Sequence, residues 1–247
     1  FERSRNGYAL TAAGEDMLVI AGQMAEAVMD FERRVAGMDA RPTGEVRVTT
    51  TESIFSFLLA PVFARFREAY PGITLDVIID SRPLNLSRRD ADVAIRASSE
   101  PQETLVGRRI ATMGWAPYAA AGLATDPAVP LAALDMPWIG YSEPVSLSHA
   151  GRWIAAHIGE ERHVITVNTV TAVSQFIEAG AGIGYLPCFA GDQMSSLKRL
   201  ADPSKEITSA LWVLTHADLR RSVRTRAFLD FVASDLSKAR KLIEGSR

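Results

Sequence analysis

Alternation of β-branched, apolar segments with amphipathic helical segments is the feature that most constrains how this chain can fold. Residues 45–51 alternate in polarity and predict a strand, and residues 54–66 place apolar side chains on one broad helical face that a Pro-Gly pair ends. Residues 73–79 and 91–95 predict two more strands. Strand–helix–strand units with short connections imply parallel strands joined by right-handed crossovers.

The same alternation recurs in the second half of the chain. Its expected segments are a strand at 138–141, a helix at 148–158, a strand at 164–167, a helix at 171–179, a strand at 183–186, a β-like stretch at 210–215 and a helix at 219–236. The last strand and helix can close onto the first unit. The sequence therefore predicts an α/β protein built from two such units.

The first forty residues predict one long helix with a narrow apolar seam. Asn6 and Gly7 indicate a two-residue hairpin turn, and Thr11 can cap the helix that follows. The seam has alternating spacings of four and three residues, and it comprises Leu10, Gly14, Met17, Ala21, Met24, Val28, Phe31 and Val35. A 3.5-residue period is typical of a helix that packs along a partner helix. We interpret the positions from Met17 to Val35 as a dimerisation seam; packing on the helix's own domain is the alternative.

Composition limits the classes of partner and compartment. The 247 residues carry 27 Lys+Arg and 29 Asp+Glu, a formal net charge of −2, so any DNA contact would be local or lie outside the chain. The single cysteine, Cys188, excludes an internal disulfide. No apolar run approaches the ~20 residues of a membrane span, and no signal peptide opens the chain. We expect a cytoplasmic protein.

Patterns that carry catalysis or metal binding do not occur in the sequence. The four histidines, His149, His157, His163 and His216, lack metal-ligand spacing. The glycines at 180, 182 and 184 follow a helix and enter a strand, the reverse of a phosphate-binding turn. A redox role for Cys188 is an alternative to a buried structural thiol, which we favour. We expect no enzyme, no metal and no cofactor.

Residues 1–15 carry a pattern, F-x-R followed by L-T-x-x-G-E, that resembles the end of the DNA-binding domain of LysR-type transcriptional regulators. The resemblance implies that residues 1–42 are the wing of a winged helix-turn-helix and the linker helix, and that most of the helix-turn-helix is missing from the chain. It also implies that Arg3 and Arg5 are wing contacts to DNA phosphate. A solvated hairpin is the alternative for these two arginines.

The resemblance extends over nearly the whole chain. Five further segments match the family's order: 44–49, 70–73, 90–96, 179–187 and 227–231. It implies an effector-binding domain at 43–247, like periplasmic solute-binding proteins, with two Rossmann-like subdomains and an effector in the cleft between them. Subdomain I would span about 43–98 and 214–247, and subdomain II about 99–213.

Ligands of open α/β sheets bind beyond the carboxyl ends of the strands, beside helix N-termini. The candidate effector-binding residues at these ends are Thr50, Thr51, Ser53, Ser81, Arg82, Arg96, Tyr141, Asn168, Thr169 and Pro187. Arg82 and Arg96 would suit a carboxylate through bidentate hydrogen bonds. The alternatives are ion pairs of these arginines with Asp80, Asp90 or Asp92, and a purely capping role for the hydroxyl side chains.

The resemblance and the residues together predict a ligand-responsive, DNA-binding transcriptional regulator. It would be a homodimer or homotetramer that senses a small, anionic metabolite. A solute-binding receptor of the same fold is the alternative, which the seam helix disfavours. An enzyme on this scaffold is a third hypothesis, for which the sequence offers no catalytic residue set.

Overall fold

The computed structural model of the chain describes residues 2–4, 7–11, 13–14, 17–18, 20–22, 24–25, 28, 42–80, 91–123, 136–159, 162–207 and 209–246. The chain divides into two compact units, Phe1–Pro42 and Thr43–Arg247. In the described part of the chain, no helix combines the length and apolar character that a membrane crossing requires.

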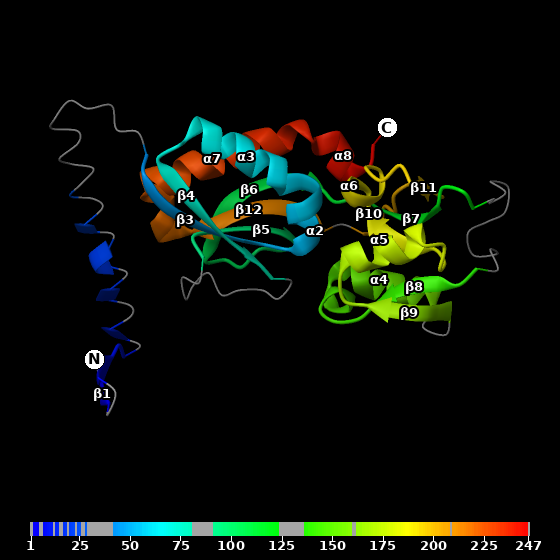
Figure 1. Cartoon of the computed structure of the whole chain (residues 1–247), viewed down its shortest axis with the longest axis horizontal. Coiled ribbons are helices and arrows are strands. Elements are labelled where there is room, and N and C mark those ends of the chain that lie inside the picture. Colours follow the sequence, from blue (N-terminus) through cyan, green and yellow to red (C-terminus); the bar gives the residue numbers. More distant parts are fainter. Residues whose placement is uncertain are drawn as a thin grey trace. The chain divides into compact units, whose positions relative to one another are not determined.

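The first unit is a hairpin followed by a helix (Figure 1). Strands β1 (Glu2–Ser4) and β2 (Gly7–Ala9) pair antiparallel with Ser4 opposite Gly7, which confirms the hairpin but places Gly7 in the strand and not in the turn. The described residues between positions 13 and 28 are helical. The hydroxyl of Thr11 accepts a hydrogen bond from the Gly14 N–H at 3.1 Å, so the predicted cap is confirmed.

A five-stranded sheet, in the order β4-β3-β5-β12-β6, forms the larger part of the second unit. Its strands are β3 (Gly44–Thr50), β4 (Ile73–Ile79), β5 (Val93–Ser98), β6 (Leu105–Thr112) and β12 (Ala210–His216). Strand β3 is parallel to β4 and β5, as the sequence predicts, and β12 closes the sheet by pairing antiparallel with β5 and β6. Strand β6 was not expected.

Helices cover one face of this sheet. After β3 the chain forms α2 (Glu52–Ile54), the π-helical turn η1 (Phe55–Leu59) and α3 (Ala60–Ala69), and after β12 it forms η6 (Ala217–Arg221), α7 (Val223–Lys238) and α8 (Arg240–Glu244). Helices α3 and α7 lie side by side over the sheet (Figure 1). The fully buried rings of Phe66 and Phe228 meet edge to face, 5.0 Å between centroids, and join these helices.

The remaining strands form two smaller sheets. Strand β7 (Trp115–Ala120) lies between β10 (Gly184–Pro187) and β11 (Leu197–Arg199), antiparallel to both. Strands β8 (Trp138–Tyr141) and β9 (His163–Val167) are parallel. The helical elements among them are η4 (Val145–Leu147), α4 (His149–Ile158), α5 (Val170–Glu178) and α6 (Cys188–Gly191). The segments expected at 138–141, 148–158, 164–167, 171–179 and 183–186 are confirmed, whereas β7 and β11 were missed.

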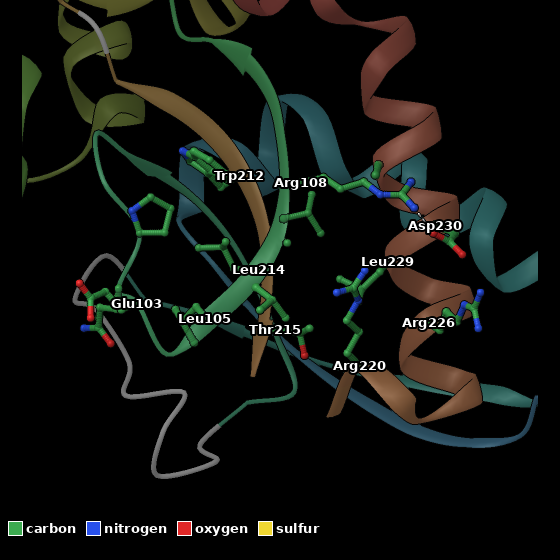
Figure 2. Close-up of a pocket in the computed structure, with 16 residues that line it drawn as sticks. Glu103, Leu105, Arg108, Trp212, Leu214, Thr215, Arg220, Arg226, Leu229 and Asp230 are labelled. Atoms are coloured by element: carbon green, nitrogen blue, oxygen red, sulfur yellow. Dashed lines mark hydrogen bonds and ion pairs between the residues drawn. The ribbon is translucent and has the colours of Figure 1, made fainter. Parts of the chain in front are cut away.

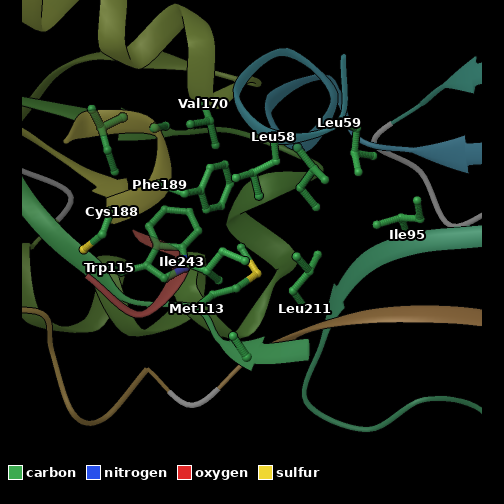
Figure 3. Packing of buried hydrophobic residues seen from close by; sticks show 14 of the residues in the cluster. Leu58, Leu59, Ile95, Met113, Trp115, Val170, Cys188, Phe189, Leu211 and Ile243 are labelled. Atoms are coloured by element: carbon green, nitrogen blue, oxygen red, sulfur yellow. The ribbon is translucent and has the colours of Figure 1, made fainter. Parts of the chain in front are cut away.

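One continuous hydrophobic core joins the large sheet to the smaller ones. Figure 3 shows its middle, where Met113 and Trp115 pack among Leu58, Phe189 and Ile243. Residues 113–114 lead from β6 to β7, and the Met113 N–H donates to the Ser209 carbonyl at 2.8 Å, just before β12. The two crossings between the sheets therefore lie against each other. The boundaries predicted at 98–99 and 213–214 assign β6 to subdomain II, whereas β6 pairs within the five-stranded sheet.

Candidate ligand-binding cleft

A cavity of about 570 Å³ opens beside the two crossings. The large sheet contributes residues that follow β3 and end β5, among them Thr51, Ser53 and Arg96. The smaller sheets contribute Pro187 and the first residues of α4 and α5. Ser148 caps α4 by accepting from the Gly151 N–H at 3.0 Å, so the first turn of this helix is fixed at the cavity wall. The cavity thus gathers strand ends and helix N-termini, as expected for an open α/β protein.

Arg96 is the cation that extends into the cavity from the large sheet. Its Nη2 atom donates to the Thr49 hydroxyl at 2.9 Å and to the Asp80 carbonyl oxygen at 2.8 Å. Burial lowers the pKa of Arg96, against the opposing effect of the Asp80 charge. Within the described residues no carboxylate lies within ion-pairing distance of this guanidinium. Two neutral oxygen atoms therefore hold the guanidinium of Arg96, which is one of the residues that line the cavity.

The charge of Asp80 raises the pKa of Arg96, but no direct ion pair of Arg96 with a carboxylate occurs among the described residues. The Asp92 carboxylate accepts from the Arg47 backbone N–H at 2.9 Å, and Asp80 reaches Arg96 through its backbone oxygen. Asp90 lies outside the described residues, as do Ser81 and Arg82.

Four of the predicted effector-binding residues line the cavity, and four described ones do not. Those that line it are Thr51, Ser53, Arg96 and Pro187. The Thr50 hydroxyl donates to the Ile95 carbonyl at 2.9 Å, and the Tyr141 hydroxyl donates to the Tyr185 carbonyl at 2.8 Å. Burial raises the pKa of Tyr141, so this hydroxyl stays protonated. Thr169 caps α5 through the Ala172 N–H at 3.1 Å, and Asn168 is exposed away from the cavity. Hydroxyl groups engaged inside the fold are not available to a ligand.

Sequence reasoning missed most of the wall, including Met113, Trp115 and His149. Met113 lies in the crossing between β6 and β7, Trp115 is the first residue of β7, and His149 is the first residue of α4. None of these three residues follows the end of a strand that the sequence predicted. The capping motif Ser148-x-x-Gly151 is the one local signal that marks His149 as a residue at a helix N-terminus.

A second hollow of about 920 Å³ lies along β6 and α7 (Figure 2). Its charged residues are all exposed, and Arg108 is paired with Asp230 at 2.5 Å. None of the described candidate residues from the sequence lines it. An open hollow with only exposed charges is a weaker ligand site than the cavity that holds the half-buried Arg96.

The predicted wing and seam residues belong to the first unit. Met17, Met24 and Val28 expose 64, 66 and 56% of their surface, and Ala21 is also exposed. Leu18 and Ile20 widen this apolar face at 62 and 44%. Arg3 lies in β1, but its side chain is outside the described residues, as are Arg5, Phe31 and Val35.

Comparison with known proteins gives one consistent family. A family model described as the LysR substrate binding domain matches residues 39–237. The HTH-type transcriptional regulator CrgA of Neisseria meningitidis serogroup C is 23% identical over 245 residues, covering 95% of this chain and 81% of that protein. The HTH-type transcriptional activator AaeR of Escherichia coli K12 is 25% identical over 191 residues, covering 75% of this chain and 62% of that protein.

Solved structures show the same fold. The regulatory domain of CrgA superposes with a TM-score of 0.66 at 24% identity, covering 79% of this chain and all of that one. The effector domain of AmpR of Pseudomonas aeruginosa gives 0.63 at 15% identity, covering 81 and 98%. These matches confirm the resemblance and the two-lobed fold expected from the sequence. This chain belongs to the LysR substrate-binding domain family.

Proposed function

We propose that this chain is the effector-sensing and dimerising part of a ligand-responsive, DNA-binding transcriptional regulator that acts in the cytoplasm. Its effector is a small anionic metabolite bound in the cleft. The observation that carries the proposal is the guanidinium of Arg96 in the wall of a cavity of about 570 Å³ between the two groups of strands, where it bonds to two neutral oxygen atoms and has no carboxylate within ion-pairing distance among the described residues. The relatives are named as transcriptional regulators and not as enzymes, which supports a regulatory role.

The position of the cleft supports a signalling role for the bound molecule. Its walls come from both groups of strands, and the crossing residues Met113 and Ser209 are part of them. A ligand that contacts both walls favours one arrangement of the two lobes over another, in proportion to its difference in affinity for the two. A solute-binding receptor of this fold, the alternative function, would bind the same ligand without needing the exposed apolar helix of the first unit.

The exposed helix supports dimerisation. A helical face with Met17, Met24 and Val28 more than half exposed is unfavourable in water unless another surface covers it. We infer a homodimer through the seam from Met17 to Val35, with tetramers formed by further contacts, and DNA phosphate contacts from Arg3 and Arg5. Because the seam helix follows directly on each wing, dimerisation would bring two wings to one DNA site.

The test of the cleft is a thermal-shift screen of small carboxylates and aromatic metabolites. Compounds that stabilise the wild-type chain should stabilise Arg67→Gln equally, because Arg67 is exposed on α3 and lines neither the cleft nor the second hollow. They should bind Arg96→Gln at least ~10-fold more weakly, since hydrogen bonds to a charged group contribute about 1.5–3 kcal/mol. A compound whose shift persists in both Arg96→Gln and Ser53→Ala would place the site elsewhere.

A further inference from the structure

Three side-chain nitrogen atoms in the cleft wall are buried, and none has a hydrogen-bond partner in the part of the chain that the structure describes. They are Nε of Arg96, Nε1 of Trp115 and Nδ1 of His149. The Trp115 side chain is 5% exposed, and its indole N–H, like the Nε–H of arginine, can only donate. Buried donors are almost always paired in folded proteins. The wall therefore lacks acceptors, which a bound molecule can supply as the wall adjusts around it.

Most of the remaining wall is apolar. The buried apolar residues that line the cleft are Ile54, Ala94, Met113, Ala150, Val170 and Leu214. They come from both groups of strands, so a ligand is in apolar contact on opposite sides. A small sugar or a compact polyanion would bury its polar groups against these apolar side chains without hydrogen-bond partners, which is unfavourable. An apolar ligand body removes them from water.

The charges of the wall fix how many negative groups the ligand can carry. Arg96 is half-buried and is the less exposed of the two described arginines that line the cleft. Glu100 and Arg152 also line the cleft, but both are exposed and of opposite sign. One ligand carboxylate can pair with Arg96, whereas a second one deep in the cleft would have no cation to meet among the described residues. The remaining unpartnered donor, the indole N–H of Trp115, suits an uncharged acceptor.

We propose, building on the function proposed above, that the effector is a hydrophobic monocarboxylic acid that carries a second, uncharged hydrogen-bond acceptor. The carboxylate pairs with Arg96 from the large sheet. The apolar body lies against Ile54 and Leu214, and the second acceptor takes the indole N–H of Trp115, the first residue of β7 after the crossing.

Four probes of one size test this assignment: 4-oxo-4-phenylbutyrate, 4-phenylbutyrate, 4-phenylbutyramide and phenylsuccinate. Calorimetry on the full chain measures the dissociation constants. The constant for 4-oxo-4-phenylbutyrate should be smaller than that for 4-phenylbutyrate, and the constants for 4-phenylbutyramide and phenylsuccinate should be much larger than both. The keto acid should bind roughly 3- to 10-fold more tightly than 4-phenylbutyrate, the ratio of one neutral hydrogen bond. The acid should bind at least ~10-fold more tightly than its amide.

Two variants separate the two contacts, and a third is the matched control. Trp115→Phe should bind both acids equally while retaining the preference for acid over amide. Arg96→Gln should lose the preference for acid over amide. Trp153→Phe should leave the whole order unchanged, because the Trp153 Nε1 atom is already bonded to Glu206 at 2.6 Å and the ring does not line the cleft.

The outcomes test the proposed class of effector separately from the proposal that the cleft binds an anion. Tighter binding of phenylsuccinate or of the amide, or a keto-acid preference that survives Trp115→Phe, overturns the class. Failure of all four probes at millimolar concentration also overturns it, and the broader screen with Arg96→Gln then decides separately whether the cleft binds an anion. If that screen also finds no Arg96-dependent compound, the proposed function fails with it.

Discussion

Gly114→Ala is expected to destabilise the second unit by about 2–4 kcal/mol, combining an overpacking cost with a weakened backbone hydrogen bond. A Cβ atom at this position would lie 2.4 Å from the Glu244 carbonyl oxygen and 2.8 Å from its carbon. Both are backbone atoms of α8, so no side-chain rotation relieves the contact. The Gly114 N–H donates to the Ile243 carbonyl at 2.9 Å, and its carbonyl accepts from the Cys188 N–H at 2.8 Å. The C-terminal helix must therefore move away from the crossing that lines the cleft.

Thermal denaturation measures this loss, since about 2–4 °C of melting temperature accompany each kcal/mol for a protein of this size. Gly122→Ala is the control, because nothing lies within 4 Å of its added Cβ. That variant should remain within about 0.5 kcal/mol of the wild type. Equal melting temperatures for the Gly114 and Gly122 variants would contradict the packing of α8 on the crossing.

Met24→Asp is expected to dissociate the dimer. In a symmetric seam each Met24 is present twice, and burying one methionine contributes about 1.5–3 kcal/mol. Removing both and placing two carboxylates in the seam should weaken association by roughly 10²- to 10⁴-fold. Sedimentation equilibrium over a range of concentrations measures the change.

The control for the seam is Gln23→Asp, which adds the same charge at a position that the sequence pattern places off the seam. It should associate like the wild type. A wild-type chain that is monomeric at high concentration, or a Met24→Asp variant that associates as tightly as Gln23→Asp, would show that the exposed helical face is not a dimer seam.

The strands that the sequence predicted are those with a clear local pattern. Strand β3 alternates exposed and buried residues from Glu45 to Val48, as its polarity predicts, and its last residues are all buried. Strand β6 ends the five-stranded sheet among the described strands, and its exposed Gly107, Arg108 and Arg109 obscure the alternation. Strand β7 is buried on both faces and contains Pro117, so it shows neither alternation nor ordinary strand composition. Such strands are defined by their neighbours and not by their own residues.

The candidate site divides in the same way. Thr51, Ser53, Arg96 and Pro187 could be predicted because they follow or end strands, where the fold places its ligands. Thr50 and Tyr141 also end strands but do not line the cleft, because their hydroxyl groups donate to backbone oxygen atoms of neighbouring strands. Trp115 could not be found from the sequence, because its place in the cleft depends on where the crossing between two unpredicted strands lies.

The most direct test of the central claim, that this chain binds an effector in its interlobe cleft, is the indole N–H spectrum of the four tryptophans on addition of a compound that stabilises the chain. Trp115 lines the cleft, whereas Trp138 and Trp153 do not. The peak that Trp115→Phe removes should shift on titration, and the peaks of Trp138 and Trp153 should remain in place. A stabilising compound that leaves the Trp115 peak unmoved and shifts one of the other two would contradict the account.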